Sequence, residues 1–253
     1  MPTTSPSIPQ IDWHNNALFL DFDGTLVEII DDPAKVELSS DTRHALTVLY
    51  RRLEGALAII SGRDLEDLRG RLAPFSPALA GSHGIEQRDA AGRVRINGGH
   101  ALDELNGLRE PLQELAMRHG LLLERKTGAL SLHFRNRPEL ETECRAFVAK
   151  LVNARPGLRV IHGNMVAEIS LAGNDKGVAV AAFMKEDPFK GRLPVMVGDD
   201  TTDEDAFRAA NDLGGFGVRI GSGTTNARYR IASTAQFLTW LQQQASGSDR
   251  GRI

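Results

Sequence analysis

The sequence predicts an α/β fold that is built on a mainly parallel β-sheet. Short apolar runs alternate along the chain with stretches of helical periodicity, which is the pattern of βαβ units. Three of the apolar runs, at residues 17–20, 56–60 and 193–197, end abruptly in polar or acidic residues. Because open parallel sheets bind their ligands beyond the carboxyl ends of the strands, these strand ends predict one shared functional site.

The first two strand ends carry short polar motifs. Residues 17–20 run directly into Asp-Phe-Asp-Gly-Thr at residues 21–25, where two acids flank an aromatic residue and a turn glycine follows. Residues 56–60 give way to Ser-Gly-Arg-Asp and then to leucines at helical spacing. Either Ser61 or Asp64 is therefore expected to cap the next helix.

The third strand end is strongly acidic, and a lysine motif precedes its strand. Residues 198–205 read Gly-Asp-Asp-Thr-Thr-Asp-Glu-Asp and lead into a predicted helix. Upstream, Asn-Asp-Lys-Gly at residues 174–177 begins a predicted helix through 178–184, with Lys176 in its first turn. A cation there opposes the helix dipole and lowers stability, which indicates a functional reason for Lys176.

The middle of the chain has the pattern of an α+β insertion. One helix is expected in its first part, followed by strands near 130–134, a second helix through 139–152 and strands near 159–169. Glycines at 98–99 and 173 are expected hinges. The expected organisation is a loose tail at 1–11, a core domain at 12–102 and 172–244, an inserted domain at 103–171 and a second tail at 245–253.

Composition and charge exclude several classes of protein. With 253 residues, 41% of them hydrophobic, the chain can bury a core without disulfides. Its formal charge of −3 offers no positive field for nucleic acid, and no apolar run approaches the length of a membrane span. The single cysteine, Cys144, favours a reducing, cytoplasmic location. We expect a small-molecule partner, and a monomer is favoured although the sequence does not fix the oligomeric state.

The acids at the first and third strand ends have the chemistry of a magnesium site. Asp21 and Asp23 lie two residues apart, so both can face a common ligand from an extended strand end. Mg²⁺ binds through one or two carboxylates together with backbone oxygen, water and substrate phosphate. Asp21, Asp23 and Asp199 meet this requirement, with Asp200 and Asp203 close behind them.

Donors at the same strand ends predict a phosphate site beside the metal. Backbone amides in tight turns and a lysine side chain bind phosphate oxygens well. The candidate phosphate-binding residues are Phe22, Gly24, Thr25, Ser61, Gly62, Arg63 and Lys176. Acids that bind a divalent cation next to such donors indicate phosphoryl transfer.

Each motif has a simpler interpretation when it stands alone. The acids near helix starts are also ordinary caps, and Ser-Gly-Arg is also an ordinary turn. Asp-x-Asp-Gly also begins calcium loops, but that template needs an acid at position 5 and a glutamate at position 12, where this chain has Thr25 and Asp32. The sequence contains no GxxxxGK[ST], GxGxxG or GxSxG motif of nucleotide-binding proteins or serine hydrolases.

Taken together, the motifs resemble those of the haloacid dehalogenase (HAD) superfamily of phosphatases. Its four motifs match, in order, residues 21–26, Ser61, Lys176 and residues 198–204. This resemblance implies a Rossmann-like core with helices on both faces of the sheet, and a smaller α+β cap domain of the C2 type.

Within that superfamily the chain is similar to trehalose-6-phosphate phosphatases. The similarity rests on residues 21–28 with Pro33 downstream, 60–63, 81–84, 132–135, and Glu168 ahead of Lys176. One departure is Phe134, where family members often carry tyrosine. The resemblance implies Mg²⁺-dependent hydrolysis of trehalose 6-phosphate to trehalose and phosphate, the last step of trehalose biosynthesis.

The resemblance also implies a role for each site residue. Asp21 is expected to attack phosphorus and form an aspartyl-phosphate, while Asp23 protonates the departing sugar oxygen and then activates water. Mg²⁺ is expected to bind Asp21, the Asp23 carbonyl and Asp199, and Lys176 completes the catalytic set. The residues expected to support these groups from behind are Asp200, Thr202 and Asp203.

The inserted domain is expected to be a mobile cap that closes over the sugar and reads its hydroxyl groups. Polar residues of this domain, and one histidine of the core, are the candidates for sugar binding. They are Lys126, His133, Arg135, Asn164, Glu168 and His83.

Three other functions remain open at the level of sequence. They are a HAD phosphatase for another sugar phosphate, a phosphotransferase or mutase that uses Asp21 in the same way, and a sugar-phosphate binder without catalysis. Release of free phosphate separates hydrolysis from transfer to a sugar hydroxyl. The binder is disfavoured because Asp21, Asp23 and Asp199 would concentrate like charge without a metal.

Overall fold

The computed structural model describes residues 8–30 and 32–247. Much of the two predicted tails, 1–11 and 245–253, therefore lies outside the described residues. The chain divides into two compact units, one comprising Met1–Arg95 and Asp175–Ile253 and the other Ile96–Asn174. The predicted limits of the inserted domain, 103 and 171, lie inside the second unit.

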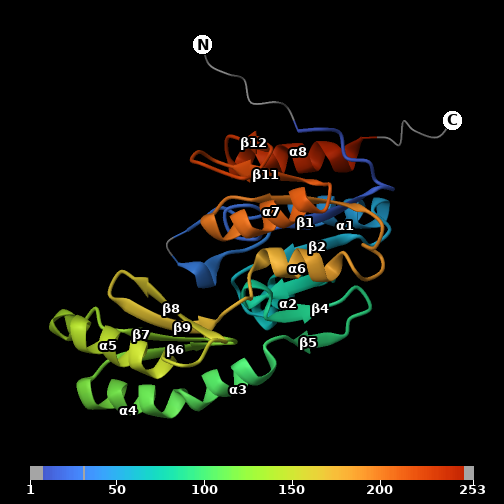
Figure 1. The fold of residues 1–253 in the computed structure, drawn as a ribbon. Coiled ribbons are helices and arrows are strands. Elements are labelled where there is room, and N and C mark those ends of the chain that lie inside the picture. The colour runs from blue at the N-terminus through green and yellow to red at the C-terminus, as the bar shows by residue number, and fades with distance from the viewer. Residues whose placement is uncertain (1–7, 31, 248–253) are drawn as a thin grey trace. The chain divides into compact units, whose positions relative to one another are not determined.

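The first unit is built on an eight-stranded sheet (Figure 1), and this sheet confirms the predicted, mainly parallel α/β fold. The strand order is β12-β11-β10-β1-β2-β3-β4-β5. The strands are β1 (Asn16–Leu20), β2 (Leu57–Ile60), β3 (Ala78–Gly81), β4 (Glu86–Arg88), β5 (Val94–Ile96), β10 (Leu193–Gly198), β11 (Phe216–Ile220) and β12 (Tyr229–Ile231). Pairings from β12 through β3 are parallel, and β4 runs antiparallel to β3.

The three strands that end in polar motifs are neighbours in this sheet. β1 pairs with β10 on one side and with β2 on the other, and Leu20 is in register with both Val197 and Ile59. The polar segments after these strands therefore begin at one edge of the sheet. All residues of β1 and β2 are buried, as is typical of parallel strands covered on both faces.

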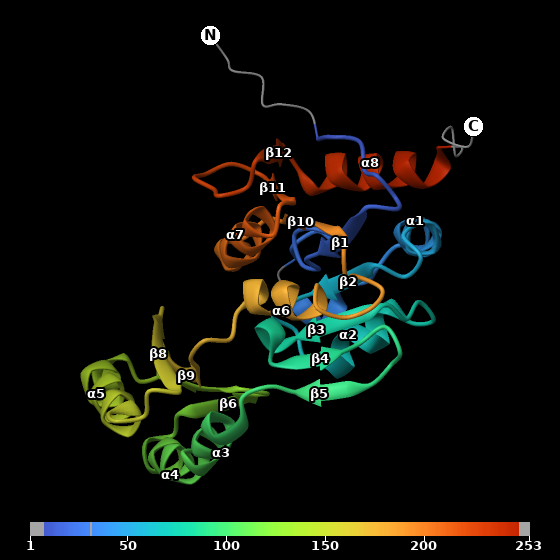
Figure 2. The ribbon, with the colours of Figure 1, turned by 45° about the vertical axis from the view of Figure 1, so that its right-hand side comes forward.

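Helices flank the sheet of the first unit. They are α1 (Ser40–Arg52), α2 (Leu65–Leu72), α6 (Lys176–Phe183), α7 (Glu204–Asp212) and α8 (Thr234–Ser246), with short 3₁₀ turns η1 (Pro33–Lys35), η2 (Ser82–Gly84) and η4 (Thr201–Asp203). Figure 2 shows α6 and α7 on one face of the sheet and α1 and α8 on the other, as expected of a Rossmann-like core. Asp64 rather than Ser61 caps α2, since its side chain accepts a hydrogen bond from the Asp67 N–H.

Aromatic rings fill the space between β1 and α6. The ring centroid of Phe19 lies 5.4 Å from that of Phe189 and 6.3 Å from that of Phe183, and all three side chains are buried. Aromatic pairs at such distances add attraction to the hydrophobic gain. This packing fixes α6, with Lys176 as its first residue, against the strand that ends before Asp21.

The second unit is an antiparallel sheet with helices packed against it, as the predicted α+β pattern requires (Figure 1). The strand order is β6-β7-β9-β8. Its elements are α3 (Gly99–Gly107), α4 (Arg109–His119), β6 (Leu122–Lys126), β7 (Ala129–His133), η3 (Pro138–Leu140), α5 (Glu141–Val152), β8 (Leu158–Gly163) and β9 (Val166–Leu171). No helix in the described part of the chain is long and apolar enough to cross a membrane.

The structure differs from the prediction at the start of the second unit. The sequence predicts one helix there, and the structure has two, α3 and α4. Pro111 explains the break, because it has no N–H to donate to the Gly107 carbonyl as a continuous helix would require. Ending α3 at Gly107 and starting α4 at Arg109 places Pro111 in a first turn, where proline is tolerated.

Candidate active site

Lys176 is buried between two carboxylates at the edge of the large sheet. Its Nζ lies 2.6 Å from Asp21 Oδ1 and 2.7 Å from Asp203 Oδ1, and the side chain is 3% exposed. Lys176 is the first residue of α6, and Asp175 caps this helix by accepting a hydrogen bond from the Val178 N–H. The two ion pairs compensate for placing a cation at the N-terminus of a helix.

Asp203 organises the turn that follows β10. Its Oδ2 accepts hydrogen bonds of 3.0 Å from the backbone N–H groups of Asp199 and Asp200. Gly198 leaves room for this carboxylate, because a Cβ at residue 198 would lie 2.3 Å from Asp203 Cγ. Both Asp203 oxygens thus already accept hydrogen bonds, and the side chain orients Asp199 and Lys176.

Asp21, Asp199 and Asp203 form a cluster of carboxylates that can hold a metal ion. One oxygen of each residue lies within 4.8 Å of the others. Asp199 Oδ1 is buried and has no hydrogen-bond partner among the described residues. Gly24 lies against the same carboxylate, since a Cβ at residue 24 would be 2.2 Å from Asp199 Oδ2. A buried carboxylate oxygen without a partner, beside further acids, is suited to a hard divalent cation.

Burial and charge repulsion shift the ionisation of this cluster. Desolvation raises the pKa of Asp21 to about 8, against the attraction of Lys176, and raises the pKa of Asp199 to about 6. Burial alone would lower the pKa of Lys176, but attraction by Asp21 and Asp203 outweighs it and raises this pKa. Lys176 therefore stays protonated and pairs with Asp21 and Asp203. A divalent cation bound beside Asp21 and Asp199 would favour the deprotonated forms of both carboxyl groups, because it attracts their negative charge.

Asp23 is held by a two-point contact with Arg63. Nε of Arg63 lies 2.7 Å from Asp23 Oδ2 and Nη2 lies 2.7 Å from Asp23 Oδ1, while Nη1 lies 2.8 Å from Asp67 Oδ2. Hydrogen bonding to Asp23 raises the pKa of Arg63, so the guanidinium stays charged. The sequence predicts that Arg63 binds phosphate through the backbone amides of its turn, and the structure shows that its guanidinium binds two carboxylates.

The other predicted phosphate-binding residues lie at the same strand ends. Ser61 is buried, and its Oγ accepts a hydrogen bond of 3.2 Å from the N–H two residues along the chain. Thr25 is fully buried, and its Oγ1 has no partner within the described part of the chain. Gly62 leaves room for His83, whose ring would lie 2.7 Å from a Cβ at residue 62. Phe22 is fully buried in the core, so only its backbone is a candidate for phosphate binding.

Gly24 contributes its shape to the turn rather than an open donor. Its N–H donates a hydrogen bond of 2.8 Å to the Val27 carbonyl, so this amide is already engaged. Its φ of +80° lies in the left-handed region that favours glycine. The phosphate-binding role of Gly24 stays a prediction, and in the structure its amide donates within the turn.

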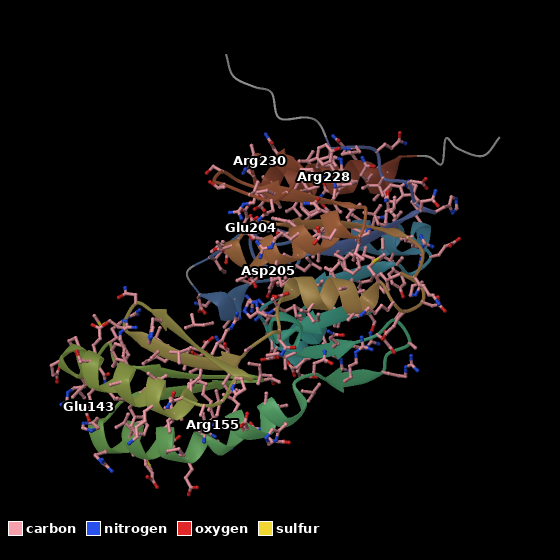
Figure 3. The ribbon with its side chains drawn as sticks, in the orientation of Figure 1. Glu143, Arg155, Glu204, Asp205, Arg228 and Arg230 are labelled. Carbon is pink, nitrogen blue, oxygen red and sulfur yellow. The ribbon has the colours of Figure 1, made fainter. Side chains whose placement is uncertain are left out.

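The turn that carries Asp200 and Thr202 is exposed, and a side chain of the neighbouring strand β11 holds it in place. Asp200 Oδ1 accepts hydrogen bonds from the N–H and the hydroxyl of Thr201, at 2.6 and 2.9 Å. Arg219 of β11 donates to the Asp200 carbonyl at 2.9 Å and lies 3.2 Å from Glu204, which Figure 3 labels on α7. Sequence patterns carry no signal for Arg219, because 19 positions separate it from Asp200.

In the second unit, polar side chains gather on one face of the small sheet. The strand register and the alternation of side chains place on this face Glu124, Lys126, Ser131, His133 and Glu168. Ser131 Oγ donates a hydrogen bond of 2.6 Å to Glu168. Glu124 lies 3.0 Å from His133 and 3.2 Å from Lys126. Glu124 and Ser131 are not among the predicted residues, and the signal that could have found them is the period-two alternation of β6 and β7.

The remaining predicted sugar-binding residues are exposed. Arg135 and Asn164 lie just after β7 and β8 in the second unit, and His83 lies in η2 of the first unit. Phe134 is fully buried, with the guanidinium carbon of Arg145 5.5 Å from the ring centroid. A ring without a hydroxyl suits this buried position.

Comparison with known proteins identifies the family. The sequence profile of the trehalose-phosphatase family matches residues 19–235. The chain belongs to the trehalose-phosphatase family. The trehalose-6-phosphate phosphatase of Escherichia coli (strain K12) is 38% identical over 228 residues, which are 89% of this chain and 85% of that protein.

Solved structures agree with this membership of the trehalose-phosphatase family. One crystal form of Aspergillus fumigatus trehalose-6-phosphate phosphatase is similar with a TM-score of 0.69 at 26% identity, and the match covers 96% of this chain and 100% of that one. A phosphatase of the HAD superfamily from Bacteroides thetaiotaomicron shares the fold with a TM-score of 0.62 at 17% identity, covering 95% and 99% of the two chains. The predicted family is confirmed, and the fold is shared with a phosphatase of the HAD superfamily.

Proposed function

We propose that the chain hydrolyses trehalose 6-phosphate to trehalose and phosphate. Membership of the trehalose-phosphatase family supports the substrate. The observation that carries the chemistry is the burial of Lys176 between Asp21 and Asp203. A nucleophilic carboxylate needs a fixed orientation and a neighbouring positive charge, and Lys176 supplies both to Asp21.

In the proposed reaction, Asp21 attacks phosphorus. A bond forms between an Asp21 carboxylate oxygen and phosphorus while the bond from phosphorus to the sugar oxygen breaks, which gives an aspartyl-phosphate. Lys176 holds Asp21 at Oδ1 and places its charge near the oxygens on which negative charge shifts. Water then cleaves the aspartyl-phosphate, releases phosphate and restores Asp21.

Asp23 handles the protons of both steps in this proposal. It donates a proton to the departing sugar oxygen and later takes one from the attacking water. Its side chain is 37% exposed, against 5% for Asp21, so it can meet a ligand that enters from solvent. Arg63 holds the Asp23 carboxylate at two points and so fixes the direction in which the proton is presented.

We propose Mg²⁺ as the cation of the site. Asp21, Asp199 and the Asp23 carbonyl would hold it, and the unpartnered buried Oδ1 of Asp199 among the described residues supports this set. Bound Mg²⁺ would neutralise charge on the phosphate and favour attack on phosphorus. Asp203 supports the set by fixing the Asp199 backbone, and Asp200 and Thr202 belong to the same turn.

Two buried hydroxyls are proposed to bind the phosphate oxygens together with Lys176. Thr25 Oγ1 has no hydrogen-bond partner among the described residues, and a ligand oxygen would satisfy it. Ser61 Oγ accepts one backbone hydrogen bond and keeps its own proton for a ligand. Gly62 completes this group, because a residue without a side chain leaves room there for the His83 ring.

The polar face of the small sheet is proposed to bind the sugar. It offers acceptors on Glu168, donors on Lys126 and both kinds of group on His133, which suits a ligand rich in hydroxyl groups. Arg135 and Asn164 extend this set from the strand ends. His83, which lies in the first unit, is proposed separately as a residue that binds the sugar. A site built for hydroxyl groups rejects analogues that lack them, which would make the cap the source of selectivity.

We also propose a cytoplasmic, monomeric enzyme that acts on a small molecule without nucleic acid or membrane partners. The single cysteine, Cys144, is free and buried in α5, so the fold uses no internal disulfide. The formal charge of −3 supports a partner other than nucleic acid. Size-exclusion chromatography with light scattering tests the monomer, and a dimer mass would overturn it.

The proposed function is tested by phosphate release from a panel of sugar phosphates, with Mg²⁺ and with chelator. We expect Mg²⁺-dependent release that is fastest with trehalose 6-phosphate. Asp21→Asn should lower this rate by about 10³-fold or more without unfolding the protein. The matched control is Asp41→Asn, on the exposed side of α1, which should keep the full rate.

Other outcomes of this experiment contradict parts of the proposal. Equal rates over several monosaccharide phosphates would keep the phosphatase and overturn the substrate. Transfer of the phosphoryl group to a sugar without free phosphate would indicate a phosphotransferase or mutase. Binding without turnover would indicate a sugar-phosphate binder.

A further inference from the structure

Thr234 connects α8, the last helix in the described part of the chain, to the loop that carries Asp23. Its Oγ1 donates a hydrogen bond of 2.5 Å to the Gly24 carbonyl, across 210 residues of sequence. Thr234 is 8% exposed, so the contact is largely shielded from water. The residue lies outside the segments that predict the site, and no step of the proposed reaction uses it.

The hydroxyl of Thr234 is not needed by its own helix. Thr234 is the first residue of α8, and Ser233 caps this helix by accepting a hydrogen bond from the Gln236 N–H. Thr239, one turn and a half further on, donates to the Ala235 carbonyl within the helix. Thr234 is instead directed at another element of the first unit.

Gly24 is fixed from three sides. Its N–H donates within the turn, its carbonyl accepts from Thr234, and its α-carbon packs against Asp199, where a Cβ would lie 2.2 Å from the carboxylate. Asp23 precedes Gly24 and the buried Thr25 follows it. A rotation of the backbone at Gly24 would therefore move two residues of the proposed site.

Helix α8 is anchored well enough to hold this loop. Phe237 and Leu241 are fully buried in the core of the first unit. At the other end of α8, Arg52 of α1 donates hydrogen bonds to the carbonyls of Gln244 and Gly247. A donor presented by a helix held at both ends fixes the position of the loop that accepts from it.

We propose that Thr234 is a positioning residue that sets the turn at Asp23 and Gly24 against Asp199 for phosphoryl transfer. This inference rests on the proposed phosphatase function. Loss of the hydroxyl leaves a buried carbonyl without its donor, so the turn is expected to shift. Small displacements of catalytic groups lower the rate of reaction by large factors, whereas substrate binding through other groups is retained. We therefore expect loss of the hydroxyl to lower kcat and to leave KM nearly unchanged.

The test compares Thr234→Val, which removes the hydroxyl and keeps the shape, with Thr234→Ser, which keeps the hydroxyl. kcat and KM are measured with trehalose 6-phosphate and with p-nitrophenyl phosphate, well below the unfolding temperature of each variant. We expect Thr234→Val to lower kcat about tenfold with KM within about twofold, and Thr234→Ser to stay within about twofold of the unmodified protein. Thr239→Val is the matched control on the same helix and should keep its kinetics.

Two outcomes would overturn the inference directly. They are an unchanged kcat in Thr234→Val, and a loss in Thr234→Ser as large as in Thr234→Val, because a missing hydroxyl would then not be the cause. If Thr234→Val does not fold, Thr234→Cys replaces it with nearly the same shape and a weaker donor, and an unchanged kcat there also overturns the inference. An unmodified protein that hydrolyses neither ester would instead overturn the proposed function, so the two failures are distinguishable.

Discussion

Arg63 decides how Asp23 can act. Its guanidinium is planar, so Nε and Nη2 can meet both Asp23 oxygens at 2.7 Å while Nη1 binds Asp67. Arg63 lies two residues before α2 and Asp67 lies in the first turn of that helix, whereas Asp23 follows β1. The side chain proposed to move protons is therefore oriented by a neighbouring element.

Replacing this arginine should impair the protonation of a poor leaving group. A lysine ammonium is a point charge that cannot form the two parallel bonds, so Arg63→Lys should leave Asp23 less well oriented. We expect kcat for trehalose 6-phosphate to fall about tenfold to a hundredfold, and kcat for p-nitrophenyl phosphate, whose leaving group needs little protonation, to fall less than about threefold. Steady-state kinetics on both esters measure the ratio.

The matched control is Arg69→Lys. Arg69 is half exposed on α2, the helix that follows Arg63, and it pairs with Glu66, so its replacement should change neither rate. Equal losses on both esters in Arg63→Lys would contradict the orienting role. That result would favour a role of the Arg63 side chain that both esters share, such as holding the turn that carries Asp23.

The predictability of the site differs from residue to residue. Asp21, Ser61 and Asp199 could be proposed from the sequence because each follows an apolar run, and the parallel register then brings those strand ends together. Lys176 could be proposed because a cation in a first helical turn needs an explanation. The contact of Arg63 with Asp23 spans 40 positions and follows no period, so only the fold reveals it.

At the scale of elements, the small sheet separates its two faces by alternation. On β7 and β9, Leu130, Leu132, Ala167 and Ile169 are buried, while Ser131 and Glu168 between them point to the polar face. Such alternation could be read from the sequence. The break between α3 and α4 was harder to predict, because it depends on one proline in an otherwise helical pattern.

Glu168 gives a test of the polar face. If it accepts hydrogen bonds from sugar hydroxyls, Glu168→Ala should lower kcat/KM for trehalose 6-phosphate about a hundredfold and change that for p-nitrophenyl phosphate less than about threefold. If the alanine variant unfolds, Glu168→Gln is measured in its place, because glutamine keeps an acceptor for the Ser131 hydroxyl. Kinetics on the two esters, with thermal unfolding of each variant, provide the measurement.

Glu114→Ala is the control, since Glu114 is exposed on α4 of the same unit. It should keep the rates of the unmodified protein on both esters. A uniform loss in Glu168→Ala, on sugar and aryl phosphate alike, would speak against recognition of the sugar and for a general defect of the protein.

At the scale of the whole molecule, the carboxylate cluster couples stability to pH and to cations. Burial raises the pKa of Asp199 to about 6 and that of Asp21 to about 8, from ordinary values near 4. The folded chain therefore binds protons at these groups more tightly than the unfolded chain. Their contribution to stability is present below about pH 4 and is lost as pH rises through about 6 to 8.

A divalent cation should reverse this loss, because it binds the deprotonated carboxylates and competes with protons for the same oxygens. We expect the rise in unfolding temperature on adding Mg²⁺ to grow from about pH 5 to about pH 8, since more of the cluster is deprotonated at the higher pH. The measurement is the unfolding temperature with Mg²⁺ minus the unfolding temperature with chelator, taken at each pH. Groups far from the cation titrate in both samples, so their effect cancels in this difference. Asp199→Asn should remove most of the Mg²⁺-dependent rise in unfolding temperature. Asp41→Asn, on α1 and outside the carboxylate cluster, should leave this rise unchanged. A Mg²⁺ effect that does not change with pH would show that the raised pKa values of Asp21 and Asp199 do not govern cation binding.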